Sequence, residues 1–149
     1  MKGWMCVIKV ACVCLCLVIG LAACEKAPVN RDIEGHWRLD YFTILESDSV
    51  VTCDRLFYGI MSKSTLISEK QGTHGYGSFV ALTEYREHES VLVLKDFKVY
   101  GSAGVDATVE QLLPFGICNR EETVFAVKVS TGKRMVLESD YARLELKKF

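Results

Sequence analysis

The chain has 149 residues, with 18 Lys and Arg, 19 Asp and Glu, and a formal net charge of −1. This length allows one domain with a hydrophobic core and is too short for two of ordinary size. The net charge is close to zero, and the chain has no run of Lys and Arg that could replace the counterions of a phosphate backbone. Both features argue against a nucleic-acid partner.

Residues 1–23 have the layout of a secretory signal, with a charged start, an apolar middle and small residues at the cut. The apolar stretch, residues 10–23, is shorter than the roughly 20 residues of a membrane-spanning helix. The motif Leu21-Ala22-Ala23-Cys24 resembles a bacterial lipobox, whose cysteine is acylated on sulfur and becomes the new N-terminus. The resemblance implies a palmitate-type anchor on Cys24 and a place in the cell envelope, at the outer membrane. The alternatives are a transmembrane anchor and an ordinary signal peptide.

Residues 24–32 contain Pro28 and Asn30 and are predicted to form a lipidated tether. A flexible coil of this length reaches roughly 17 Å. The folded domain is expected to cover residues 33–149. Removing the signal takes away Lys2 and Lys9, which leaves 16 basic against 19 acidic residues and a charge of −3.

The domain is predicted to be almost entirely β-structure. Short runs of β-branched and aromatic residues recur between turn-forming residues, about 8–12 residues apart. Residues 72–75, rich in glycine, are expected to form one of the hairpin turns. The runs predict strands at residues 35–46, 50–60, 66–69, 77–88, 91–100, 123–129, 135–139 and 142–148.

Residues 106–113 break the strand pattern. Thr108 and Gln111 have the spacing of a capping box, and Pro114 and Gly116 follow as residues that end a helix. One short helix is therefore expected before the last three strands. About eight antiparallel strands can form an up-and-down barrel or a two-sheet sandwich, and the order of strands does not choose between them.

Three segments resemble the small lipocalin-like lipoproteins of Gram-negative gut bacteria. Residues 33–39 contain Gly35-His36-Trp37, a Gly-x-Trp opening, and residues 112–117 and 135–149 are similar to the segments near the family's C-terminus. The resemblance implies a calycin-type barrel of about eight strands. It also implies that Trp37 closes one end, with a basic side chain from the last strand, Arg143, stacked on its ring.

Five aromatic residues are spread over the predicted strands. If the barrel forms, some of them must point inward, and a barrel of eight strands can hold one small molecule. The predicted pocket for a small apolar ligand is lined by Trp37, Tyr41, Phe57, Phe79 and Phe97. The alternative is that the rings pack on one another and leave no void.

Only two of the seven cysteines, Cys53 and Cys118, lie in the predicted domain. Outside the cytosol they allow a disulfide, which would contribute about 4 kcal/mol by closing a long loop. The alternative is two separate buried thiols. Without a Cys-x-x-Cys pair, the cysteines do not predict a zinc site.

No catalytic motif is visible in the chain. The three imidazoles, His36, His74 and His88, are scattered, and His88 is expected on a solvated strand face. Residues 72–77 share only their glycines with a phosphate-binding loop, because the following Lys-Ser/Thr pair is missing. No enzyme activity, metal or cofactor is therefore predicted.

The sequence thus predicts a lipid-anchored, non-catalytic barrel of the cell envelope that binds a small apolar ligand. The alternative is an interaction or inhibitor module that contacts an envelope protein with the outside and the loops of the barrel.

Overall fold

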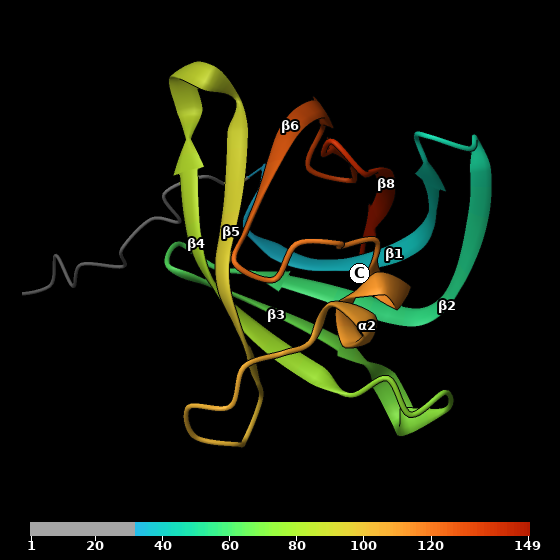
Figure 1. Cartoon of the computed structure of the whole chain (residues 1–149). Helices are drawn as coiled ribbons and strands as arrows, with labels where there is room; N and C mark the ends of the chain where they lie inside the picture. The colour runs from blue at the N-terminus through green and yellow to red at the C-terminus, as the bar shows by residue number, and fades with distance from the viewer. Residues whose placement is uncertain (1–31) are drawn as a thin grey trace, which may run out of the picture.

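The structure is a computed structural model, and it describes residues 32–149 (Figure 1). The predicted signal, Cys24 and nearly all of the predicted tether lie outside the described residues. Within the described part of the chain, no helix is both long and apolar enough to cross a membrane.

Eight strands form one closed antiparallel barrel, in which each strand pairs with its neighbours in sequence and β8 pairs with β1. This confirms the barrel over the sandwich. All eight predicted strands are present, with shifts of up to a few residues at their ends. They are β1 (Gly35–Ile44), β2 (Ser49–Ile60), β3 (Ser64–Glu69), β4 (Ser78–Arg86), β5 (Val91–Val99), β6 (Glu122–Ser130), β7 (Arg134–Glu138) and β8 (Ala142–Lys148).

The connections fall at two ends of the barrel because successive strands run in opposite directions. The Trp37 end carries residues 32–34, the turns at 61–63, 87–90 and 131–133, and the C-terminus. The helix end carries the turns at 45–48, 70–77 and 139–141 and the long β5–β6 connection, residues 100–121. Figure 1 shows this connection, with α2 (Val109–Leu112), lying across the ring of strands.

The short helix begins at a complete capping box. The Thr108 hydroxyl accepts a hydrogen bond from the Gln111 backbone N–H, and the Gln111 side chain accepts one from the Thr108 N–H. The helix is shorter than the predicted 106–113, because Asp106 forms a β-bridge with Lys98 instead. Pro114 does not stop the helix but lies in the following 3-10 turn, η3 (Leu113–Phe115).

The barrel interior is a continuous apolar core. Every second side chain of each strand points into the barrel, and these side chains meet there. Their exclusion from water is the main stabilising contribution to the fold. The largest side chains that are fully buried are Trp37, Tyr58, Phe42, Phe79, Phe97, Phe115 and Phe125.

Candidate functional site

The helix end of the barrel is filled by the chain itself. Leu112, Phe115 and Ile117 in the β5–β6 connection are completely buried and belong to the main core. The Phe115 ring meets the Phe79 ring edge-on, with 6.0 Å between centroids. We call residues 107–117 the mouth plug, since they occupy the end at which a lipocalin-type barrel would open.

Close contacts hold the mouth plug in place. The buried Tyr58 hydroxyl donates a 2.6 Å hydrogen bond to the Phe115 carbonyl oxygen. Gly116 has a φ of 79°, and a Cβ there would lie 3.2 Å from both Phe42 Cγ and Leu144 Cδ1. Glycine therefore allows both the turn and the close approach of the plug to the barrel wall. Burial raises the pKa of Tyr58 well above its usual value, so the hydroxyl stays a neutral donor.

The five aromatic residues of the predicted pocket do not line one cavity. Trp37, Phe79 and Phe97 lie inside the barrel as members of the packed core. Tyr41 is 39% exposed and lies outside, because an irregularity in β1 between Leu39 and Tyr41 shifts the alternation of side chains.

Phe57 points to the outside of the barrel, because it alternates with the inward-pointing Leu56 and Tyr58, but it is only 8% exposed. Its ring packs edge-on against Phe149, with 5.0 Å between centroids, and the Lys70 ammonium lies 4.6 Å from its centre.

Three hollows in the described residues lie elsewhere. One of about 330 Å³, beside the β4–β5 irregularity, is lined by Asp96, Phe97, Lys98, Asp106, Arg120 and Glu121. An adjoining hollow of about 190 Å³ shares Asp96 and Lys98 with it. A third, of about 100 Å³, lies at the Trp37 end between Ile33 and Leu92. The largest of these three is lined mainly by charged side chains and is not an apolar calyx.

Lys148, and not Arg143, stacks on Trp37, so the prediction for the basic partner was wrong. The Lys148 ammonium lies 4.4 Å from the centre of the indole ring and donates a 2.7 Å hydrogen bond to the Glu34 carbonyl oxygen. The register of β1 and β8 explains the difference, since Trp37 pairs with Lys148 and Thr43 with Arg143.

Trp37 itself closes its end of the barrel. Its side chain is completely buried, and its indole N–H donates a 2.8 Å hydrogen bond to the carbonyl oxygen of Ile33. This hydrogen bond fixes the segment before β1 at the Trp37 end of the barrel.

Substituting Lys148 with methionine should lower the free energy of unfolding by about 0.5–2 kcal/mol, because a cation over an indole face is lost. Arg143→Met is the matched control. Arg143 is exposed and makes only a 3.8 Å ion pair with Glu138, so its loss should cost about 0–1 kcal/mol. Urea unfolding of both variants measures the difference, and a larger loss for Arg143→Met would contradict the assignment.

Cys53 and Cys118 are separate free thiols, each half-buried, and not a disulfide. Burial, reinforced by the negative charge of Asp40, raises the pKa of Cys53 to about 12. Burial and the charge of Asp140 also raise the pKa of Cys118. Because the thiolate is the reactive form, neither thiol is poised as a nucleophile.

Cys53 should therefore resist iodoacetamide at pH 8, reacting on the order of a thousandfold more slowly in the native protein than in urea. Stability should also fall as the pH rises from about 9 toward 12, because the unfolded thiol loses its proton before the folded thiol does. Mass spectrometry of alkylated peptides measures the first effect. Equal labelling in both states would contradict the protonated, buried thiol.

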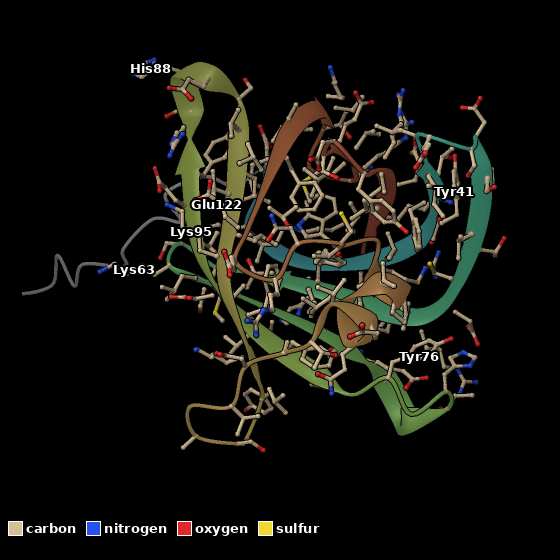
Figure 2. The ribbon with its side chains drawn as sticks, in the orientation of Figure 1. Tyr41, Lys63, Tyr76, His88, Lys95 and Glu122 are labelled. Carbon is tan, nitrogen blue, oxygen red and sulfur yellow. The ribbon has the colours of Figure 1, made fainter. Side chains whose placement is uncertain are left out.

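The three histidines do not converge. His74 stacks on Tyr76 in the 70–77 loop at the helix end, whereas His88 lies in the β4–β5 turn at the Trp37 end; Figure 2 shows Tyr76 and His88 far apart. His36 lies beside Gly59. Among the described residues, no group of three His, Cys, Asp or Glu side chains could hold a metal ion.

Glu69 is a buried carboxylate that the sequence analysis did not single out. Its oxygens accept hydrogen bonds from the backbone N–H groups of His74 and Tyr76, which fixes the 70–77 loop. Burial alone would raise the pKa of Glu69, but these hydrogen bonds and the nearby His74 outweigh it and lower the pKa. The hydrogen bonds give Glu69 a structural role.

The eight antiparallel strands close into a barrel in sequence order, and a tryptophan seals one end. These features define a calycin-type barrel of the lipocalin class. The chain belongs to the lipocalin-like domain family, which matches residues 17–149. No curated protein matches the chain.

Two crystal structures share the fold. One is an uncharacterized protein of Bacteroides eggerthii, with a TM-score of 0.59 and 19% identity over 78% of this chain and 98% of that one. The other is a lipocalin-like protein of Bacteroides uniformis, with a TM-score of 0.56 and 18% identity over 79% of this chain and 99% of that one.

Proposed function

We propose that this protein is a lipid-anchored, non-catalytic binding module of the cell envelope, and that it contacts a protein partner with the helix end of its barrel. Acylation of Cys24 would place it at the outer membrane. Support for binding comes from the family, and support for a surface contact comes from the mouth plug, which occupies the space where an internal ligand would lie.

The direction of the chain supports the helix end as the binding face. The segment before β1 is attached at the opposite end, where the carbonyl oxygens of Asp32 and Ile33 accept hydrogen bonds from Ser130 and Trp37. An acyl chain on Cys24 would hold the Trp37 end toward the membrane. The helix end would then face away from the membrane.

Apolar side chains at the helix end are exposed to solvent. They come from the β1–β2 hairpin, the β3–β4 loop and the β5–β6 connection, and two of them, Val50 and Tyr100, are more than 60% exposed. The others are Leu45, Tyr76, Val105 and Leu113. Six of the eleven large apolar side chains that are exposed among the described residues thus lie at this end, which favours it as the surface that contacts another protein.

A photoreactive amino acid tests this orientation in the host cell. Placed at Tyr100, which is 62% exposed, it should give one discrete crosslinked adduct, whereas placed at Met61, which is 56% exposed at the Trp37 end, it should not give that adduct. The same adduct from both positions, or none from Tyr100, would refute the helix end as the binding face.

The second candidate is a small apolar ligand that replaces the mouth plug. The plug shows that the mouth accepts apolar groups, but exposing three large side chains would cost about 5–9 kcal/mol. A ligand would have to offset that cost with its own apolar surface, as a long acyl chain can at about 0.8 kcal/mol per CH₂. Native mass spectrometry of protein from the host tests this candidate, since a bound small molecule in every preparation would favour it.

A further inference from the structure

The N-terminal half of β2 has one edge without a neighbouring strand. β2 pairs with β1 along its length but with β3 only from Leu56 to Ile60. Arg55, with a φ of 58°, marks the point where β2 turns away from β3. Figure 1 shows this part of β2 rising at the rim of the barrel with no strand on its outer side.

The register shows which backbone groups face the free edge. The Leu45 N–H donates to the Tyr141 carbonyl oxygen, on the β8 side of β1. The backbone N–H and C=O groups of successive residues point to opposite sides of a strand. Phe42 and Ile44 therefore direct these groups toward β2, where the two residues pair with Val51 and Ser49.

The residues of β2 that alternate with Ser49 and Val51 are Val50 and Thr52, and the regular register with β1 ends after Thr52. The N–H and C=O groups of Val50 and Thr52 therefore point to the free edge, and no backbone group of another described strand pairs with them there. Two donors and two acceptors stand in a row, as they do along a strand that accepts a further strand.

The surroundings of this edge are acidic. Glu46, Asp48 and Asp54 are all exposed on the β1–β2 hairpin. Arg55, the cation next to Asp54 in the chain, lies 4.0 Å from the Asp54 carboxylate and directs a guanidinium nitrogen to Gln71, 2.6 Å from its side-chain oxygen. The edge is thus matched to a segment that carries positive charge.

A second copy of this chain fits the edge less well. Antiparallel pairing of two β2 edges about Val51 would bring Asp48 of one copy opposite Asp54 of the other, and like charges directly opposite are destabilising. Two barrels joined in this way would also point their Trp37 ends in opposite directions, so both could not face one membrane.

We propose that residues 49–54 of β2 bind an extended, basic segment of a partner protein as an additional strand. This inference rests on the proposed contact at the helix end and names its chemistry. The incoming backbone would pair with Val50 and Thr52, and alternate Lys or Arg side chains would lie near Asp48 and Asp54.

Binding of a synthetic peptide to the full-length protein in detergent tests the proposal. The probe is acetyl-Lys-Val-Lys-Val-Thr-Val-Lys-amide, and its control is the same peptide with alternate backbone nitrogens methylated. The unmodified peptide should bind and slow hydrogen exchange at the Val50 and Thr52 amides, while the methylated peptide should bind at least tenfold more weakly. Equal binding of the two peptides, or no binding of the first, would overturn the proposal.

A pair of substitutions at Thr52 locates the site. Thr52→Pro removes an outward N–H, which an edge strand tolerates, and should weaken peptide binding at least tenfold. Thr52→Val keeps the N–H and should bind as the parent does. If Thr52→Pro fails to fold, Asp54→Asn with Asp48→Asn should weaken binding severalfold, and unchanged binding would refute the basic partner.

The two proposals can fail separately. A Tyr100 adduct in cells without peptide binding would overturn the β2 edge and leave the helix-end contact standing. If position 100 gives no adduct in cells, the proposal that the helix end is the contact face is overturned.

Discussion

Replacing Trp37 with alanine should lower the free energy of unfolding by about 3–5 kcal/mol, the range for truncating a large buried aromatic residue. Trp37 is completely buried and closes one end of the core. Its loss removes the hydrogen bond to Ile33 and the ring under Lys148 as well as the packing. Urea unfolding followed by circular dichroism measures the change.

Tyr100→Ala is the matched control for this measurement. Tyr100 is 62% exposed in the β5–β6 connection, so its truncation should change stability by about 0.5 kcal/mol or less. A Trp37→Ala variant as stable as Tyr100→Ala would show that the tryptophan does not seal the barrel.

Substituting Cys24 with alanine should abolish incorporation of labelled palmitate and leave the precursor uncleaved. The physical effect of the lipid is large, because each buried CH₂ contributes about 0.8 kcal/mol and two or more chains make attachment stable. Replacing residues 1–24 with the signal of a secreted protein should therefore move nearly all of the barrel into the soluble fraction.

Cys53→Ala is the control for the acylation experiment, since this thiol lies in the barrel wall and should leave labelling and cleavage unchanged. Full palmitate labelling of the Cys24→Ala variant would rule out the lipobox assignment.

The strand pattern was readable in the sequence because alternation with period two is a local property. Residues 142–148 alternate so regularly that the predicted and observed bounds of β8 coincide. The capping box at Thr108 and Gln111 is local as well, and it is present in the structure.

Other features could not be read because they depend on how strands meet. The irregularity that turns Tyr41 outward leaves no mark in the alternation of β1 alone. The register of β8 against β1 decides which cation reaches Trp37. Because the two strands are antiparallel, the end of β8 lies beside the start of β1, and this could have indicated Lys148 as the partner. The role of Glu69 depends on the position of the 70–77 loop, whose backbone N–H groups at His74 and Tyr76 donate to its carboxylate.

The sequence by itself determined the eight strands and the short helix, because each depends on the pattern of neighbouring residues, and the lipobox stays a prediction. Only the tertiary structure decided that Leu112, Phe115 and Ile117 fill the mouth and that part of β2 lacks a neighbour. Both depend on contacts between segments far apart in the chain, such as the hydrogen bond from Tyr58 to Phe115, and such contacts are fixed only when the barrel closes.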